Sequence, residues 1–290
     1  MFGFLNVNKP AGPTSHDVVA RVRRRLPRGT KLGHAGTLDP AADGVLVLCV
    51  GPATRLADYA QRGAKRYTAE VTLGAVSTTD DGEGQITVTQ QVRPPSRKDV
   101  GQALRRFVGR IEQIPPAHSA VHVNGRRAYK LARKGEAPAL APRTVEIHGI
   151  ELVSYEWPML VIDVRCGAGT YVRALARDLG AALEVGGYCS RLTRTAVGPF
   201  RLEHAVELDT LDPQRDLISP LVALESLRKL EVAEGELRAL RMGQRVAMGE
   251  PHERQSVDVE VAVVNAKGDL IALAEVRGDV LHPKKVFPPG

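Results

Sequence analysis

Hydrophobic positions follow two different periods along the chain. From Tyr67 to Leu73 every second residue is apolar or aromatic, which predicts a strand with those side chains on one face. Apolar residues recur instead at every third or fourth position in residues 18–26 and 100–107, as expected of helices that pack on a core. Further strands are predicted at residues 2–7, 86–92, 145–156, 159–166 and 188–197, and further helices at about 54–61 and 172–179.

The pattern changes near residue 209. Residues 209–221 show little periodicity and contain two prolines, which is typical of a domain boundary. Beyond them, the sequence predicts a short helix at 233–242 and a hairpin of two strands at 257–264 and 270–276. We therefore expect a large domain at residues 1–219 and a small β-rich domain at residues 220–290.

Charge is distributed unevenly over these two parts. The net charge is +7, and residues 1–219 hold 30 Lys and Arg against 22 Asp and Glu, while residues 220–290 hold 10 against 11. A basic surface on the large domain favours a polyanionic partner such as a nucleic acid. Aromatic residues make up only 4% of the chain, so an open platform for stacking bases is not expected.

Other features narrow the class of protein. The longest apolar run near the centre is Val45 to Val50, too short to span a membrane, and the N-terminus lacks the pattern of a secretory signal. We therefore expect a cytoplasmic protein. The three cysteines, Cys49, Cys166 and Cys189, are odd in number and lack the spacing of a zinc site, so we expect reduced core residues and no metal.

Two segments carry dense positive charge. The outer face of the helix near residues 18–26 continues into Arg28 and Lys31, where phosphate contact and a solvated charged face are both plausible readings. The second segment, near 113–142, has five basic residues between Arg126 and Lys134. We expect a mobile arm whose charge suits wrapping a folded RNA, with a solvated insertion as the alternative. By contrast, the acidic loop at residues 78–84 fits no calcium-binding pattern, and we expect a solvated hairpin there.

The most informative stretch runs from Gly33 to Gly51. Glycines and the pair Asp39-Pro40 make its first half a loop, and the apolar run that follows has the length of a buried strand. This places the carboxylate of Asp39 at the mouth of a strand, with His34 nearby. On local chemistry alone, an aspartate before proline is more often a turn residue than a catalytic one.

The full pattern G-H-x-G-x-L-D-P-x-A-x-G-x-L closely resembles the signature of the TruB family of tRNA pseudouridine synthases. Three more blocks match that family in the expected order. They are Lys65-Arg66-Tyr67 with Leu73-Gly74, Pro115-Pro116 to Ser119-Ala120 with Gly125-Arg126, and Gly169-Thr170-Tyr171-Val172-Arg173.

The resemblance implies an α+β fold, the pseudouridine synthase fold, with a mixed, largely antiparallel central sheet, flanking helices and a small PUA-like C-terminal domain. It implies isomerisation of uridine 55 in the T-loop of tRNA, by a monomer that needs no cofactor, no metal and no obligatory protein partner. The implied catalytic residues are Asp39, Tyr67 and Arg173. The implied substrate-binding residues are His34, Tyr171, Leu192, Arg126, Arg127 and Lys130.

The match has departures and leaves choices open. Asp43, His122 and Ala168 stand where family members commonly have threonine, lysine and a polar or basic residue. Asp39 could attack C1′ of the ribose, attack C6 of the base, or assist removal of the C2′ proton. Alternative functions are an RNA-guided synthase and a non-catalytic RNA-binding protein or tRNA chaperone; metal-dependent phosphoester hydrolysis is disfavoured because His and carboxylate ligands are not clustered.

Overall fold

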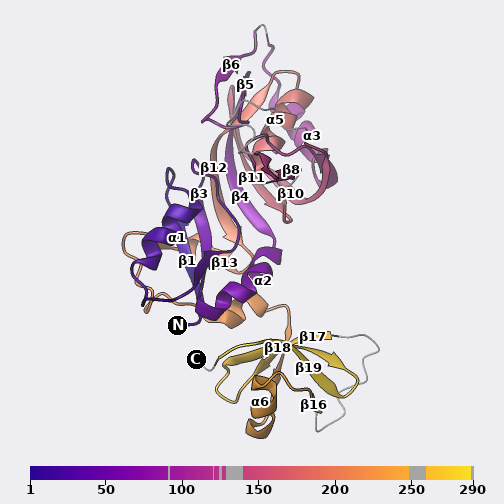
Figure 1. Ribbon diagram of the computed structural model, residues 1–290. Helices are drawn as coiled ribbons and strands as arrows, with labels where there is room; N and C mark the ends of the chain where they lie inside the picture. The colour runs from indigo at the N-terminus through magenta and orange to yellow at the C-terminus, as the bar shows by residue number, and fades with distance from the viewer. Residues whose placement is uncertain (91, 120, 124–125, 129–139, 248–258, 289–290) are drawn as a thin grey trace.

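The structure is a computed structural model of the 290-residue chain. It describes all residues except 91, 120, 124–125, 129–139, 248–258 and 289–290 (Figure 1), and the side chains of 122–123 and 126–127 also lie outside the description. The described strands form two large sheets of ten and five strands. Two short hairpins stand apart from them: β5 (Ala75–Ser77) with β6 (Ile86–Val88), and β8 (His122–Val123) with β9 (Arg126–Arg127). Within the described residues, no helix is long and apolar enough to cross a membrane.

The ten-stranded sheet carries the large N-terminal part of the chain. Its strand order is β14-β1-β3-β12-β4-β11-β10-β7, with β2 paired on β3 and β13 on β12. All neighbours are antiparallel except β1 with β14 and β3 with β12, so the prediction of a largely antiparallel central sheet is confirmed. The strands are β1 (Gly3–Lys9), β2 (Leu32–His34), β3 (Asp43–Val50), β4 (Lys65–Leu73), β7 (Gly109–Gln113), β10 (Arg143–Glu156), β11 (Met159–Cys166), β12 (Gly187–Val197), β13 (Phe200–Arg201) and β14 (Val206–Glu207).

One half of the sheet is covered by α1 (Ser15–Arg23). Thr14 caps this helix in a reciprocal capping box with Asp17. Val18, Val19 and Val22 then pack in one core cluster with β1 and β3 residues such as Leu46. Burial of these branched side chains fixes the helix on the strand that leads out of the Asp39 loop.

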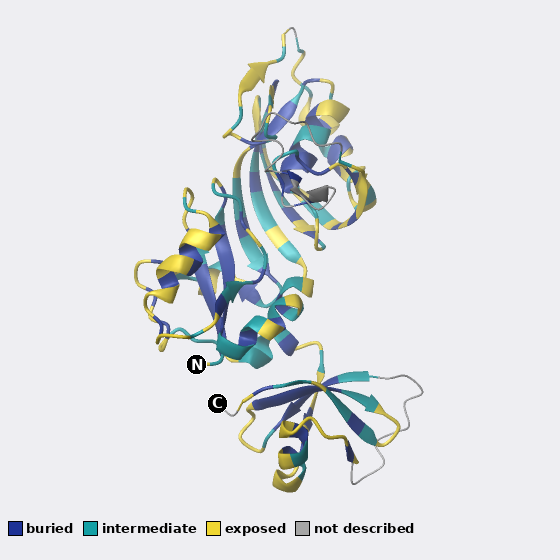
Figure 2. Ribbon diagram, viewed as in Figure 1, coloured by how far each residue is buried: buried dark blue, intermediate teal, exposed yellow. Residues whose placement is uncertain are grey.

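The other half is covered by α3 (Arg97–Arg105) and α5 (Val172–Ala182). Their apolar stripes, including Val100, Leu104, Leu175 and Leu179, share a core cluster with β4, β10 and β11. Ile162 of β11 lies in the middle of that cluster and is fully buried. In Figure 2 the buried residues follow the central strands and the inner faces of the helices. The apolar residues that recur with the 3.6-residue period of a helix therefore all face the sheet and pack on it.

The two halves meet at a short seam. Strand β12 pairs with β4 along most of its length, but with β3 only at Thr193↔Asp43 and Arg194↔Gly44. Gly44 has a φ of +101°, and a Cβ there would lie 2.3 Å from the carbonyl oxygen of Arg194. Only glycine fits this close approach. The seam brings the loop before β3 beside β12 and β4.

The five-stranded sheet lies near the C-terminus. Its order is β15-β17-β18-β19-β16, and the predicted hairpin and short helix are present as β17–β18 and α6 (Glu234–Arg241). Leu224 packs in the same buried cluster as Phe4 of β1 and Phe287 of the last segment, so a continuous core joins the two sheets. The strands are β15 (Arg228–Glu231), β16 (Val246–Ala247), β17 (Val259–Val264), β18 (Leu270–Arg277) and β19 (Val280–Val286).

Short helical turns connect these elements. The predicted helix at 54–61 is split into η1 (Gly51–Leu56) and α2 (Ala57–Arg62), while η2 (Leu202–His204) and η3 (Pro220–Leu224) follow the main sheet. The second sheet starts at Arg228, and the domain boundary between residues 219 and 220 stays a prediction.

Two details differ from the sequence predictions. The strand expected at 86–92 ends at Val88, and all three of its residues are exposed, so no core supports a longer strand. Gln113, predicted to begin the basic insertion, is the buried last residue of β7. The three cysteines are buried and unpaired, as expected.

Candidate active site

Asp39 lies in the loop between β2 and β3, and this loop is held by its backbone. The amide of Leu38 donates to Ser15 Oγ at 2.9 Å, and the hydroxyl of Ser15 donates to the Leu38 carbonyl at 3.0 Å. Lys9 Nζ donates to the carbonyl oxygens of Pro40 and Ala42 at 3.1 and 2.7 Å. Lys9 is fully buried, so these bonds are shielded from water. The residues on both sides of Asp39 are therefore fixed.

Arg194 of β12 holds the same loop from the sheet. Its Nε donates to the carbonyl oxygen of Val45 at 2.8 Å, Nη1 to Thr37 at 3.2 Å and Nη2 to Gly36 at 3.1 Å. Arg194 is only 3% exposed. The planar guanidinium can bind several carbonyls at once because its donors point outward in a fixed fork. Arg194 thus ties the start of the loop to the strand that follows it.

Arg173, the second residue of α5, binds the carboxylate of Asp39. Its Nη2 lies 3.0 Å from Asp39 Oδ2, and its Nη1 lies 2.7 Å from Asp81 Oδ2. The same guanidinium donates to the carbonyl oxygens of Thr79 and His118 at 3.2 and 3.0 Å. The Arg173 and Asp81 side chains are nearly buried, whereas 38% of the Asp39 side chain is exposed. One oriented guanidinium therefore links a buried carboxylate to an accessible one.

The start of α5 is itself anchored to the sheet. Gln113, at the end of β7, accepts from the Tyr171 amide at 2.8 Å and donates to the Tyr171 carbonyl at 3.0 Å. A turn that contains Gly169 precedes Tyr171 and leads the chain into α5. These two bonds fix the first turn of α5, and with it the direction in which Arg173 points.

A cavity of about 340 Å³ opens in front of the ion pair. Its lining includes five of the predicted site residues, Asp39, Tyr67, Tyr171, Arg173 and Leu192. They come from the loop before β3, from β4, from the start of α5 and from β12. A smaller cavity of about 250 Å³ lies on the side of Asp81 and also reaches Asp39 and Arg173. The accessible carboxylate thus faces a space bounded by an aromatic ring and apolar residues.

The protonation states follow from these surroundings. Burial raises the pKa of Asp39, while Arg173 opposes that rise and Asp81 adds to it. Burial lowers the pKa of Arg173, but Asp39 and Asp81 more than offset this effect, so the guanidinium stays charged. Burial raises the pKa of Tyr67, which keeps its phenol neutral. The site therefore combines an ion pair with a neutral aromatic wall.

Comparison with known proteins identifies the family. A family model described as the N-terminal domain of TruB family pseudouridylate synthases matches residues 23–172, and one described as the C-terminal domain of tRNA pseudouridylate synthase B matches residues 173–230. The tRNA pseudouridine synthase B of Nostoc sp. is 41% identical, over 100% of this chain and 99% of that protein. This chain belongs to the TruB family.

Other members and a solved structure agree with this assignment. The tRNA pseudouridine synthase B of Symbiobacterium thermophilum is 48% identical over 80% of this chain and 78% of its own. The crystal structure of a Cbf5-Nop10-Gar1 complex matches with a TM-score of 0.74 and 27% identity, covering 99% of this chain and 85% of that one. The α+β fold expected from the TruB resemblance is confirmed.

Among the predicted site residues whose side chains the structure describes, His34 lies outside the lining of both cavities. It ends β2, and its ring meets the ring of His16 edge to face with centroids 5.4 Å apart. Its buried Nδ1 has no hydrogen-bond partner among the described residues. Burial lowers the pKa of His34, and the nearby His16 adds to this effect, so the neutral ring is favoured.

The predicted basic arm of this TruB family member is described only in part. The backbones of Arg126 and Arg127 form β9, but their side chains lie outside the described atoms, and Lys130 lies outside the described residues. Val121 and Ala128, on either side of the hairpin, are buried. The Ala128 amide donates to the Val121 carbonyl oxygen at 2.7 Å, so these two residues close the hairpin.

Three supporting residues were missed in the sequence. Asp81 belongs to the loop that was expected to be a solvated hairpin. The hairpin is present, since the loop joins β5 to β6, but the expected solvation is wrong for Asp81, which is buried against Arg173. Arg194 and Lys9 were not singled out. A lysine or arginine inside an otherwise apolar strand can indicate a buried supporting residue in the sequence, because a buried charge requires polar partners. Their partners here are backbone carbonyls, which no residue pattern reveals.

Among the described residues, no cluster of three His, Cys, Asp or Glu side chains could hold a metal ion.

Proposed function

We propose that this protein converts uridine 55 in the T-loop of tRNA to pseudouridine. The reaction breaks the bond from N1 of uracil to C1′ of ribose and forms a bond from C5 to the same carbon, so it consumes no second reactant. The target base is hidden in a folded loop and must be flipped into the cavity. The proposal requires no cofactor.

The observation that carries the proposal is the Asp39–Arg173 ion pair facing Tyr67 in one cavity. Asp39 is the group with both negative charge and exposure at that point, and we assign it the nucleophilic or charge-stabilising role at the reacting nucleotide. Arg173 orients the carboxylate and favours its ionised form. Tyr67 and Leu192 provide a wall against which the detached base can turn without escaping.

The remaining assignments concern the RNA. His34 lies one ring away from the exposed His16 at the edge of the site, and we assign it a contact with the RNA strand near the flipped base. Tyr171 lines the cavity and contacts the same nucleotide. We assign Arg126, Arg127 and Lys130 to the phosphates of the T-arm on the basis of the family resemblance and their charge. Because tRNA is the proposed substrate, we expect a cytoplasmic monomer.

The decisive experiment uses the purified full-length protein and an unmodified tRNA transcript, without added metal or guide RNA. Pseudouridine is mapped by chemical modification and primer extension. Conversion at position 55, absent from a transcript with cytidine at that position, supports the proposal. No conversion under these conditions, or conversion at unrelated positions, contradicts it.

An RNA-guided synthase is the second candidate, because the Cbf5-Nop10-Gar1 structure shares the fold. Sequence identity favours an enzyme that acts without a guide RNA. A relative named tRNA pseudouridine synthase B is 41% identical over the whole chain, whereas the chain in the Cbf5-Nop10-Gar1 structure is 27% identical. Conversion of tRNA by the isolated chain separates the two readings. A strict requirement for added guide RNA and partner proteins favours the second candidate.

A further inference from the structure

A second cavity with a different chemistry lies at the end of α1. It is open, has a volume of about 760 Å³, and is lined by residues 23–24, 26–32 and Thr54. Its floor includes the apolar Leu26 and Leu32, and its rim carries four cationic side chains and no carboxylate. The cations are Arg23, Arg24, Arg28 and Lys31. A rim of one sign of charge is an electrostatic signal for an anionic partner.

Three of these cations make no bond within the described part of the chain. The side chains of Arg24, Arg28 and Lys31 are exposed and form neither a hydrogen bond nor an ion pair with another described residue. The neighbouring Arg25, by contrast, donates to the carbonyl oxygens of Leu208 and Leu211 and serves the fold. Arg23 donates to the Leu32 carbonyl at 3.2 Å. The cluster therefore separates into structural arginines and three cations available to a partner, which we call the α1 basic rim.

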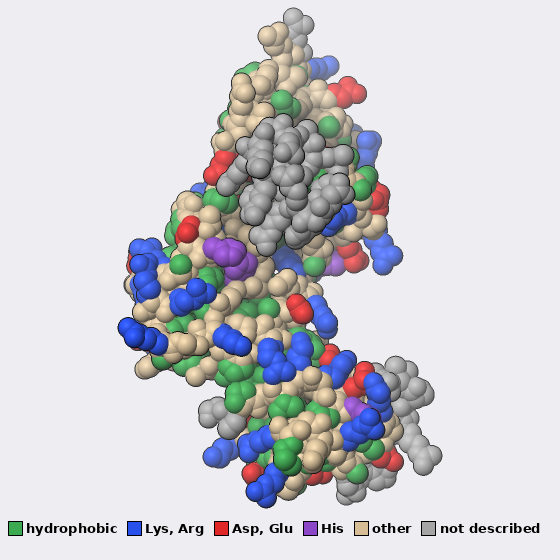
Figure 3. All heavy atoms as spheres, viewed as in Figure 1, with side chains coloured by type: hydrophobic (Ala, Val, Ile, Leu, Met, Phe, Trp, Pro, Cys, Tyr) green, Lys and Arg blue, Asp and Glu red, His purple; other side chains and the backbone are tan. Residues whose placement is uncertain are grey.

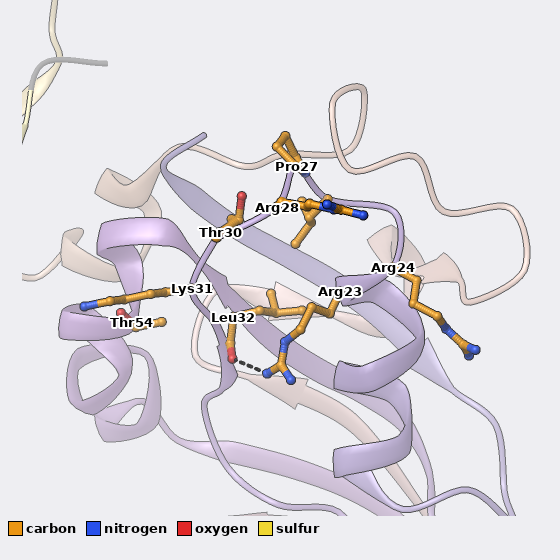
Figure 4. A pocket seen from close by; sticks show the side chains of 10 residues that line it. Arg23, Arg24, Pro27, Arg28, Thr30, Lys31, Leu32 and Thr54 are labelled. Carbon is orange, nitrogen blue, oxygen red and sulfur yellow. Dashed lines mark hydrogen bonds between the residues drawn. The ribbon is translucent and has the colours of Figure 1, made fainter.

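The directions of these side chains exclude a single small anion as the partner. In Figure 4, Arg24 and Lys31 point to opposite sides of the cavity, and Arg28 extends from the loop between them. One phosphate ion could not reach all three at hydrogen-bond distance. Spaced cations along a surface instead suit the repeated phosphates of a nucleic-acid backbone. Figure 3 shows Lys and Arg side chains gathered over this part of the molecule.

The α1 basic rim is tied to the candidate active site by two rigid paths. Ser15, the first residue of α1, is bonded to Leu38 beside Asp39, and the nine-residue helix runs about 14 Å from there to the rim. Lys31 is also three residues before His34 along β2, or about 10 Å. The rim thus lies at a fixed distance of about 14 Å from the Asp39 loop along α1 and about 10 Å from His34, on the order of three to four nucleotide steps.

We propose that the α1 basic rim binds backbone phosphates of the substrate RNA, in the stem that flanks the loop with the target uridine. This rests on the proposed function for the identity of the RNA, but the contact itself needs no catalysis. Arg24, Arg28 and Lys31 would position the RNA without reading its sequence, because phosphate contacts carry no base information. The rim would then set the distance from the stem to the nucleotide that enters the Asp39 cavity.

The test compares two triple variants with the same loss of charge. The rim variant is Arg24→Gln/Arg28→Gln/Lys31→Gln. The matched control is Lys98→Gln/Arg105→Gln/Arg106→Gln, on α3 and at its C-cap, where the side chains are also exposed and form no hydrogen bond or ion pair with another described residue. Both are made in an Asp39→Asn background so that the RNA is not altered during binding. Affinity for a tRNA transcript is measured from low to moderate salt, and essential phosphates are mapped by ethylation interference.

We expect the rim variant to flatten the slope of log K against log salt by about 2 to 3, which corresponds to three lost phosphate contacts. The α3 control should keep the parent slope. Interference should disappear at stem phosphates next to the target loop, and an RNA reduced to the loop and its closing base pairs should bind the rim variant and its parent equally.

Equal slopes for the rim variant and its parent would overturn the proposal, as would equal flattening in both triple variants, which would indicate non-specific attraction only. Interference confined to the acceptor end would also overturn it. The two proposals fail separately: a protein that shows the expected stem contacts but forms no pseudouridine would refute the proposed function and leave the rim contact standing.

Discussion

The loop that carries Asp39 and the helix start that carries Arg173 face each other but are stabilised in different ways. The loop is held by cations, Lys9 and Arg194, that bind neutral backbone carbonyls. The helix start carries a cation that is bound by two carboxylates, Asp39 and Asp81. The first arrangement fixes position, and the second also sets the charge state of the reacting group.

This difference explains why two nearby arginines are not equivalent. Arg194 has no carboxylate partner among the described residues, and its bonds go to the backbone of the loop. Arg173 divides its two terminal nitrogens between carboxylates. Removing Arg194 should therefore loosen a loop, while removing Arg173 should leave two carboxylates poorly compensated in a partly buried place. The following experiments rank these effects.

The largest effect is expected for Asp39→Asn. An amide can neither attack carbon nor carry the negative charge that Arg173 compensates, so the single-turnover rate should fall by at least about three orders of magnitude. Binding of tRNA should persist because the amide fills the same volume. Asp43→Asn, four residues later at the start of β3, is the matched control and should keep most of the rate. Substantial turnover by Asp39→Asn would remove Asp39 from its role.

Arg173→Ala should come next, with Arg173→Lys less severe. Loss of the guanidinium from a buried pair typically costs on the order of 3 to 5 kcal/mol, and lysine keeps the charge but not the fork. Arg173 lowers the pKa of Asp39, so its loss raises that pKa. If the reaction needs the ionised carboxylate, the rate will decline as the pH is lowered, and this decline will begin at a higher pH than in the parent protein. The pH profile of the single-turnover rate measures this shift.

If Arg173→Ala weakens tRNA binding while the saturated single-turnover rate and its pH profile stay unchanged, Arg173 is a phosphate contact instead. The contrast between the two sides of the site would then be wrong.

Asp81→Asn should have a smaller effect with the opposite pH shift. The amide keeps one acceptor for Arg173 but loses the charge. A hydrogen bond to a charged group is worth about 1.5 to 3 kcal/mol, so we expect the single-turnover rate to fall by about tenfold to a hundredfold. Asp81 raises the pKa of Asp39, so its neutralisation lowers that pKa and moves the acid limb of the rate to lower pH. Asp80→Asn, whose carboxylate binds Arg177 at 2.9 Å, is the neighbouring control. An acid limb that moves upward for Asp81→Asn would contradict this electrostatic role.

The smallest effect on the chemical step is expected for Arg194→Met. One buried carbonyl and two partly buried carbonyls lose their donor, so the free energy of unfolding should fall by about 2 to 3 kcal/mol, as measured by urea denaturation. Arg194→Lys should recover part of this stability with one donor group. The single-turnover rate of the folded protein should remain above that of Arg173→Ala. A rate as low as that of Arg173→Ala, without loss of stability, would show that Arg194 acts on the substrate and not on the loop.

Much of the fold could be read from the sequence because local signals and packing agree. The alternation from Tyr67 to Leu73 became β4, and the polar residues Thr14 and Ser96 became helix caps with the acids three residues later. Such features depend on residues close in sequence, and packing in the core stabilises the same periodic arrangement of apolar side chains. The exposed segment after Val88 lacked that support, and the predicted strand there was too long.

The sequence alone determined the amphipathic elements, the basic character of the large N-terminal part, and the motif that marks Asp39, Tyr67 and Arg173. Only the tertiary structure decided which groups support them. Asp81 reaches Arg173 across 92 positions of the chain, and Arg194 reaches Gly36 across 158. Neither distance is encoded in a local pattern, because a buried charge is stabilised by whichever groups the fold brings within hydrogen-bond reach, including backbone carbonyls that every residue carries.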